Sequence, residues 1–210
     1  MKRREFSLSA AAVAAGAVTL PAWAQPREGK DYRKLAKPAP VEAPAGKVEV
    51  VEFFGYFCPH CNTFEPTLNA WAKTAPKDIV LHRVPVNFNA KTVPMQKLYY
   101  TLEGMGKLEP LHAQAFRYIH VERKPLQEDE QVFAWAKGQG LDLPKFKEMY
   151  NSFGVANQIR KATQLQQAYD VEGVPSMGVA GRYYVDGTMA GSMENVLRIV
   201  EQLAGQVRKG

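Results

Sequence analysis

A chain of 210 residues with 46% apolar and 10% aromatic residues can bury one ordinary core, which excludes a disordered or collagen-like protein. The formal net charge is +6, and it falls to +4 without residues 1–24, which hold three of the 27 basic and one of the 21 acidic residues. The sequence has no dense basic stripe, so the charge does not favour nucleic-acid binding.

Residues 1–24 have the three parts of a secretory signal peptide. Lys2, Arg3 and Arg4 form a basic start, and an apolar run and the small-x-small pattern Ala22-Trp23-Ala24 follow. The apolar run is shorter than the about 20 residues of a membrane span. We therefore expect cleavage after this pattern and export to an oxidising compartment. A buried N-terminal helix is the alternative, and the twin-arginine-like start leaves the export route open.

The next segments predict a lead-in followed by a βαβ unit. Residues 25–46 are rich in Pro, Lys and Ala, which favours extended, solvated chain. Residues 47–54 are almost continuously apolar, as expected of a strand buried on both faces. Helical spacing begins near Cys58, which places this residue at a helix N-terminus. Residues 78–88 then predict a second strand, parallel to the first because a crossover helix separates them.

The second half of the chain is mostly helical. Residues 93–170 form helical stretches broken by Gly and Pro, so they predict a helical insertion. Sheet character returns at residues 173–187, where Ala180-Gly181 suits a hairpin turn. Ser192 is then expected to cap a final helix.

Cys58 and Cys61 are the only cysteines, and two residues separate them beside the predicted βαβ unit, a pattern typical of a thioredoxin-like redox motif. A zinc site would need further ligands, and the four histidines show no metal-ligand spacing. A purely structural disulfide would close so short a loop that it would constrain the chain little. Redox chemistry is therefore our preferred interpretation, with zinc binding and structural bridging as the alternatives.

The two cysteines are expected to differ in pKa. The unpaired N–H groups at a helix N-terminus favour the thiolate of Cys58, and His60 beside the sulfur favours it further. Pro59 stiffens the first helical turn. A stabilised thiolate makes the reduced form favourable and the disulfide a better oxidant. Cys61, one turn further in, should be more buried, keep a higher pKa and need a proton partner.

Glu52 is the candidate proton partner. It is a lone acid in the predicted buried strand, where burial would raise its pKa, but the pattern fits an exposed edge-strand glutamate equally well. Val174-Pro175 is a second candidate. Most X-Pro bonds are trans, although a proline that begins a strand after a glycine is compatible with a special turn.

"FFGYFCPHC", followed more than a hundred residues later by "GVPSM", resembles the DsbA-type thiol:disulfide oxidoreductases of the thioredoxin superfamily. The resemblance implies an α/β thioredoxin fold with a mixed central sheet, formed by residues 47–92 and 171–210, and an inserted helical domain at residues 93–170. It also implies a monomeric periplasmic oxidase without a cofactor, which donates its disulfide to newly exported proteins. A DsbB-like membrane protein coupled to quinone would reoxidise it.

The resemblance also implies roles for single residues. Val174 matches the residue before the family's cis-proline, so we expect Pro175 to be cis, packed against Cys58, with its neighbouring backbone pairing with substrate. Glu52 matches the family's buried acid beneath the second cysteine. Arg83 stands where the family often has a lysine; arginine keeps the charge but does not release a proton readily.

Two rival functions remain open. An isomerase or reductase could use the same fold, although isomerases of this compartment usually carry an N-terminal dimerisation domain, for which residues 25–46 are too short. A peptide-binding module could keep the cysteine pair only as a structural bridge.

Overall fold

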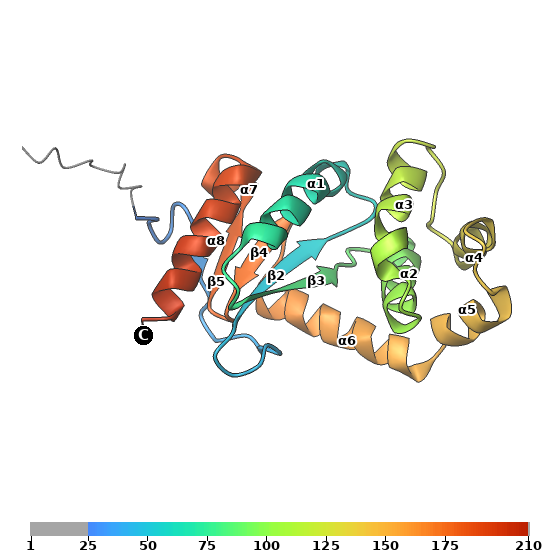
Figure 1. The fold of residues 1–210 in the computed structure, drawn as a ribbon, viewed down its shortest axis with the longest axis horizontal. Helices are drawn as coiled ribbons and strands as arrows, with labels where there is room; N and C mark the ends of the chain where they lie inside the picture. Colours follow the sequence, from blue (N-terminus) through green and yellow to red (C-terminus); the bar gives the residue numbers. More distant parts are fainter. Residues whose placement is uncertain (1–24, 210) are drawn as a thin grey trace, which may run out of the picture.

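The computed structural model describes residues 25–209, so the predicted signal peptide at residues 1–24 lies outside the described residues. Its centre is a five-stranded sheet in the order β1-β5-β4-β2-β3 (Figure 1). Strand β3 is parallel to β2, and β4 is antiparallel to it, which confirms the predicted mixed sheet. The strands are β1 (Arg33–Lys34), β2 (Val48–Phe54), β3 (Ile79–Pro85), β4 (Ser176–Val179) and β5 (Tyr183–Asp186).

Strand β2 is an interior strand between β4 and β3, and all seven of its residues are buried. Successive side chains of a strand point to opposite faces. Val48 and Val50 pack in the hydrophobic cluster of helices α1 (Pro59–Thr74) and α8 (Met193–Val207), whereas Val51 packs in the cluster of the other face. The same alternation directs Glu52 toward α1.

The predicted helical insertion is confirmed. Five helices separate β3 from β4, and all but the last gather at one end of the molecule, on the right in Figure 1. The last, α6, runs from there back to the sheet, where Tyr169 packs against Phe53. The helices are α2 (Val93–Gly104), α3 (Leu108–His120), α4 (Asp129–Gly138), α5 (Leu143–Tyr150) and α6 (Phe153–Ala168), and a short 3₁₀ helix, Ala90–Thr92, precedes them.

The lead-in at residues 25–46 differs from the expectation of solvated chain. It contributes β1, which pairs antiparallel with β5, and it buries Tyr32, Leu35 and Ala39. Its proline-rich composition favours extended backbone, and extended backbone can also pair with a sheet edge. The composition does not reveal that partner, because β5 lies far away in the sequence.

The C-terminal segment has the predicted hairpin and cap. Ala180 and Gly181 have positive φ angles of 50° and 66° between β4 and β5, as a tight hairpin turn requires. Ser192 caps α8 by accepting a hydrogen bond of 3.2 Å from the Asn195 backbone. A short helix, α7 (Gly187–Ala190), was not predicted. None of the helices in the described part of the chain combines the length and apolar character that a bilayer crossing requires.

Candidate active site

The cysteine pair lies where the chain passes from β2 into α1. Cys58 is the N-cap of α1, and its sulfur accepts a 3.4 Å hydrogen bond from the Cys61 backbone, as a side-chain cap does. Pro59 begins the helix at a position where its missing N–H leaves no bond unmade. The predicted helix N-terminus at Cys58 is therefore confirmed, and both cysteines are reduced in the structure.

Hydrogen bonding lowers the pKa of Cys58 to about 6. The largest cause is the hydrogen bond from the Cys61 side chain; burial opposes it, and the backbone N–H groups of Cys61 and His60 and the charge of His60 add to it. The direction agrees with the sequence prediction. Cys58 is 7% exposed, so it is buried but less completely than Cys61.

Cys61 has the opposite properties. Its side chain is fully buried, and burial, followed by the hydrogen bond and charge of Cys58, raises its pKa. One thiol of the pair is thus ionised near neutral pH while the other holds its proton. This asymmetry allows attack at one sulfur and makes the other dependent on a nearby proton donor.

Val174 and Pro175 lie directly beside Cys58. The bond between them is cis, as the resemblance implied, and the Cys58 sulfur lies 3.2 Å from the Val174 carbonyl oxygen, to which the thiol donates a hydrogen bond when it is protonated. A cavity of about 490 Å³ adjoins this loop, and His60 lines it together with residues that precede β4 and surround α7. The backbone before β4 therefore meets the cysteine pair at a hollow in the surface.

Glu52 is buried beneath α1 and is 1% exposed, so the edge-strand alternative is wrong. Burial, and then the charge of Glu65, raises the pKa of Glu52 to about 8 against the opposing charge of Arg83. Arg83 faces Glu52 across the β2–β3 register, and its Nε lies 3.1 Å from Glu52 Oε2. The pair is at ion-pair distance, yet neither atom makes a directed hydrogen bond.

A second buried acid, Glu65, completes a cluster around Arg83. Its Oε1 atom lies 3.1 Å from Arg83 Nη2, 2.9 Å from Asn69 Nδ2 and 3.3 Å from His112 Nε2. Sequence reasoning missed Glu65 and assigned no role to His112. Glu65 follows Cys61 by one helical turn, in the apolar stripe of α1. A charge in that stripe was the available signal, whereas nothing local indicated the contact with α3.

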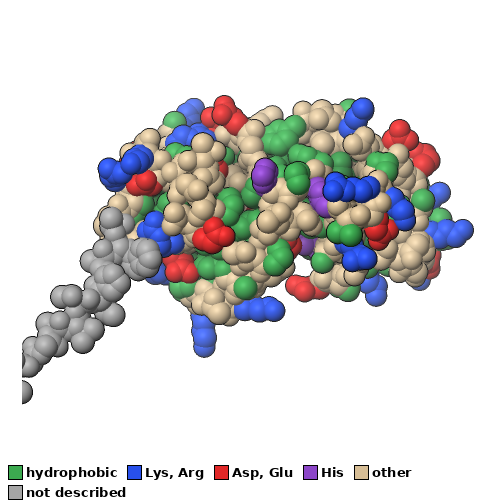
Figure 2. Space-filling model, turned by 90° about the horizontal axis from the view of Figure 1, so that it is seen from above, with side chains coloured by type: hydrophobic (Ala, Val, Ile, Leu, Met, Phe, Trp, Pro, Cys, Tyr) green, Lys and Arg blue, Asp and Glu red, His purple; other side chains and the backbone are tan. Residues whose placement is uncertain are grey.

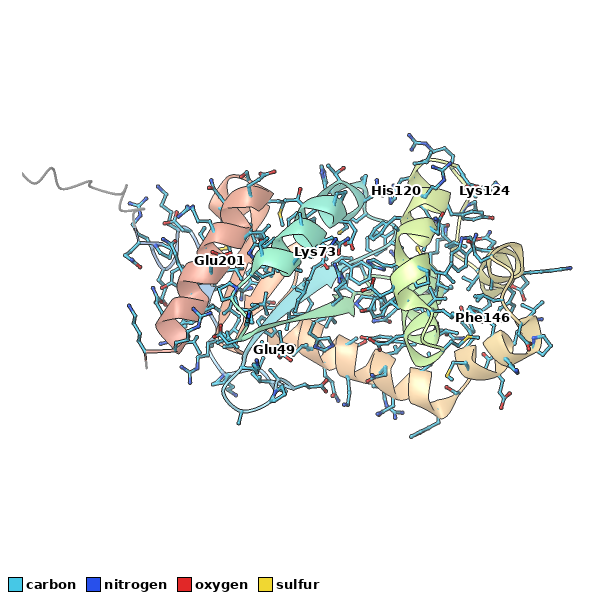
Figure 3. All side chains as sticks on the ribbon, viewed as in Figure 1. Glu49, Lys73, His120, Lys124, Phe146 and Glu201 are labelled. Atoms are coloured by element: carbon cyan, nitrogen blue, oxygen red, sulfur yellow. The ribbon has the colours of Figure 1, made fainter. Side chains whose placement is uncertain are left out.

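A second histidine of α3 lies near the cysteine loop. His120 is at the end of α3, on the side of the loop that leads into α1 (Figure 3), and its Nε2 is 2.8 Å from the Tyr56 carbonyl oxygen. Its contacts are with the Tyr56 backbone and the Phe116 ring, and not with the carboxylates of Glu52 and Glu65. Among residues 25–209, no three His, Cys, Asp or Glu side chains come together as ligands for a metal ion.

An ionised thiol at a helix N-terminus, a buried second thiol and a proline loop beside them define a thiol:disulfide exchange site on a thioredoxin-like domain. Comparison with known proteins gives the same class. The family model of the DSBA-like thioredoxin domain matches residues 67–199. This match begins after the cysteine pair. The assignment of the cysteine pair to the family therefore rests on the full-length relatives.

Those relatives are thiol:disulfide interchange proteins. The chain is 43% identical over 211 residues to DsbA of Bordetella pertussis, covering 100% of both chains, and 41% identical over 180 residues to DsbA of Pseudomonas aeruginosa, covering 86% and 85%. Among solved structures, DsbA of P. aeruginosa superposes with a TM-score of 0.81 at 40% identity, covering 86% of this chain and 94% of that one. DsbA of Xylella fastidiosa gives 0.82 at 30% identity, covering 89% and 100%. The chain belongs to the DsbA family of thiol:disulfide oxidoreductases.

Proposed function

We propose that this protein is the oxidase of its class, and that it donates the Cys58–Cys61 disulfide to newly exported proteins. The observation that carries the proposal is the position of Cys58 at the N-cap of α1 beside the fully buried Cys61, which lowers the pKa of the first thiol and raises the pKa of the second. A thiolate of low pKa is a good leaving group, so the reduced pair is favoured and the disulfide is readily given away.

The exchange takes two steps. A substrate thiolate attacks the sulfur of Cys58, forms a mixed disulfide and releases Cys61, which takes up a proton. A second substrate thiolate then attacks the substrate sulfur of the mixed disulfide and releases Cys58 as a stabilised thiolate. The protein disulfide becomes a dithiol while two substrate thiols become a disulfide, so no cofactor takes part.

Glu52 is the proposed proton partner of Cys61. With a pKa of about 8 it holds a proton at neutral pH, and its burial beneath α1 puts that proton in the interior that Cys61 shares. Cys61 leaves as a thiolate that burial disfavours, so it requires a proton at that moment. Pro59 and His60 set the properties of Cys58 through the helical turn and its N–H groups.

Val174 and Pro175 form the proposed substrate-binding edge. The Val174 carbonyl is already 3.2 Å from the Cys58 sulfur, so an extended peptide paired along this backbone would present its cysteine to that atom. Figure 2 shows hydrophobic side chains gathered over the middle of the upper face, with charged side chains toward its two ends. An unfolded protein, which exposes apolar segments, suits such a surface.

The remaining proposals follow from the family. We place the protein in the periplasm as a monomer, with residues 47–92 and 171–210 as the catalytic domain and residues 93–170 as the inserted domain. The DsbA relatives support protein thiols as its substrates. A DsbB-like membrane protein coupled to quinone is the proposed oxidant of the dithiol.

A redox titration against glutathione tests the direction of exchange. An oxidase should have a potential far above the about −270 mV of thioredoxin, and a value as low as that would favour the reductase or isomerase alternative. Cys58→Ala should abolish disulfide formation in exported proteins of a host that lacks its own oxidase. Retained activity would instead favour the peptide-binding module.

A second experiment addresses Glu52. Glu52→Gln keeps the shape of the protonated acid but cannot give up a proton. At neutral pH it should slow the release of Cys61 in single-turnover oxidation of a cysteine peptide while leaving peptide binding unchanged. An unchanged rate would remove Glu52 from the proposal.

A further inference from the structure

His112 is a residue of the inserted helices that reaches the interior of the sheet domain. It is 7% exposed, and the rings of Phe54, Tyr56 and Phe116 surround it, each with its centroid 5.2 Å from the centroid of the His112 ring. A buried imidazole needs partners for both of its nitrogens. The two polar groups within reach therefore determine what His112 can do.

The first partner fixes the tautomer of His112. Its Nδ1 is 2.7 Å from the Tyr56 hydroxyl oxygen. Burial raises the pKa of Tyr56, so its hydroxyl keeps its proton and can donate it in the hydrogen bond. Nδ1 then accepts, and the hydrogen of a neutral imidazole is on Nε2.

The second partner is the carboxylate of Glu65, whose Oε1 lies 3.3 Å from His112 Nε2. The two atoms are at ion-pair distance without a directed hydrogen bond. Burial acts to raise the pKa of Glu65, but His112, followed by Arg83 and Asn69, outweighs it and holds the pKa below its usual value. Glu65 is therefore ionised in the interior, and His112 is the polar group that the inserted helices place beside it.

Arg83 lies between two buried carboxylates. One guanidinium cannot compensate two buried negative charges, so ionisation of one acid favours the proton on the other. The ionised acid is Glu65, and its charge contributes to the raised pKa of Glu52. The pKa values of the two acids therefore shift in opposite directions, as is typical of acid and base pairs in active sites.

We propose that His112 is a positioning residue for the exchange reaction, because its Nε2, placed 3.3 Å from the Glu65 carboxylate, keeps Glu65 ionised and thereby leaves the transferable proton on Glu52. The proposal rests on the proposed role of Glu52 toward Cys61. It gives the inserted helices a part in the chemistry, through one side chain of α3.

The surroundings of this cluster allow it to exchange protons with solvent. A cavity of about 80 Å³ is lined by Glu65, Asn69, Arg83, Glu109 and His112, together with Leu108 and Ala113. Such a volume holds a few water molecules. Glu109 and Asn69 are exposed, so the cavity extends from the surface to the buried acid.

Other titratable groups also face the cluster. From α2, the Tyr99 ring lies 5.9 Å from His112, and burial raises its pKa, so it is neutral. From α1, Cys61 faces Glu52, and it is removed from the titration when the pair is oxidised. From α3 itself, Glu109 adds a charge at the solvent end. Glu65 is therefore the ionised group that lies at ion-pair distance from His112.

The test is a titration of the glutamate side chains by NMR, on selectively labelled oxidised protein, in which no thiol titrates. His112→Phe keeps an aromatic ring but removes the donor. It should lower the midpoint of Glu52 by about one pKa unit, a tenfold change in its protonation ratio, and raise that of Glu65. Midpoints that both stay within about a fifth of a unit of the parent protein would overturn the proposal.

Three further variants separate positioning from structural support. His112→Gln restores an N–H donor and should return both midpoints toward the parent values; failure to do so would overturn the proposal. Tyr56→Phe removes only the hydroxyl that orients His112 and should shift Glu52 in the same direction by less. His120→Phe is the matched control, since it changes a histidine of the same helix that does not contact the carboxylates. A similar Glu52 shift in His120→Phe would also contradict the proposal.

The result is independent of the thiol chemistry. If the midpoints shift as expected but Glu52→Gln leaves the exchange rate unchanged, His112 controls the proton distribution and the proposed role of Glu52 is wrong. If Glu52→Gln slows exchange but His112→Phe shifts nothing, the role of Glu52 stands and that of His112 does not.

Discussion

The sulfur of Cys58 and the carbonyl oxygen of Val174 lie 3.2 Å apart, although 116 residues separate them in the chain. Cys58 begins the first large helix, and Val174 precedes the strand that pairs with β2. The Cys58 sulfur and the backbone that precedes β4 are therefore neighbours. Thiol exchange and recognition of an extended peptide can take place at one point of the surface.

The first prediction concerns the source of the low pKa of Cys58. Its largest cause is the Cys61 side chain, so Cys61→Ala should raise the pKa of Cys58 above about 6, and Cys61→Ser, which keeps a donor, should raise it less. Thiolate absorbance in the ultraviolet measures both. Equal values in the two variants would show that the backbone N–H groups alone set the pKa.

The second prediction concerns the stability of the reduced protein. The pKa of Cys58 in the fold is about 6, below its unfolded value, so the thiolate contribution is present above the unfolded pKa and lost as pH falls through about 6. Between about pH 8 and pH 5, reduced protein should lose about 3 kcal/mol of unfolding free energy relative to oxidised protein. Urea denaturation at several pH values measures this difference. Cys58→Ser should show no such slope, and parallel profiles of the reduced and oxidised forms would contradict the assignment.

The third prediction concerns Glu52 in oxidised protein. Its folded pKa of about 8 lies above the unfolded value. The contribution of protonated Glu52 to the free energy of unfolding is therefore fully present below the unfolded pKa and is lost as pH rises through about 8. Glu52→Gln removes this loss and should stabilise the fold by about 3 kcal/mol at pH 7, with little effect at pH 4. Denaturation at the two pH values provides the measurement. If the stability difference between Glu52→Gln and the parent protein were the same at pH 7 and pH 4, Glu52 would ionise normally.

The fourth prediction concerns Arg83. Arg83→Met removes the cation from the buried Glu65 and should destabilise oxidised protein by about 3 to 5 kcal/mol, as broken buried pairs do. Arg83→Lys should cost less, but it cannot reproduce the contacts with both acids and Asn69. Lys145→Met, at an exposed pair with Asp142, is the control and should change stability little. Comparable losses at both sites would show that the buried cluster does not depend on its cation.

The fifth prediction concerns the contact between the inserted helices and the sheet. A Cβ atom at Gly178 in β4 would overlap the ring of Tyr169, which closes the insertion. Gly178→Ala should therefore destabilise the protein by about 1 to 3 kcal/mol, the usual range for overpacking. Gly138→Ala is the matched control, because a Cβ there meets nothing within 4 Å. Thermal unfolding of the two variants side by side measures the difference, and equal midpoints would contradict the prediction.

The parts of this structure that could be predicted are those with a local signal. The apolar run of β2, the helical spacing after Cys58 and the turn at Ala180-Gly181 each depend on neighbouring residues, and all were found in the structure. The resemblance of the cysteine motif supplied the burial of Glu52 and the cis bond before Pro175.

The features that could not be predicted depend on distant partners. Strand β1 is a two-residue segment whose partner, β5, lies near the other end of the chain. Glu65 and His112 belong to different helices, and each sequence pattern alone fits an ordinary amphipathic helix. Only the packing of α3 against α1 shows that they form one buried cluster with Arg83.

The position of the insertion also has a consequence for the order in which the protein matures. Strand β2, helix α1 and strand β3 are consecutive in the chain, whereas β4 reaches β2 only after the whole insertion. Contacts between residues far apart in sequence form late, because a long loop must close first. A chain at that stage has its two thiols but not yet the carbonyl of Val174 beside them. The thiols of the partly folded chain can therefore be oxidised before the chain can itself catalyse oxidation.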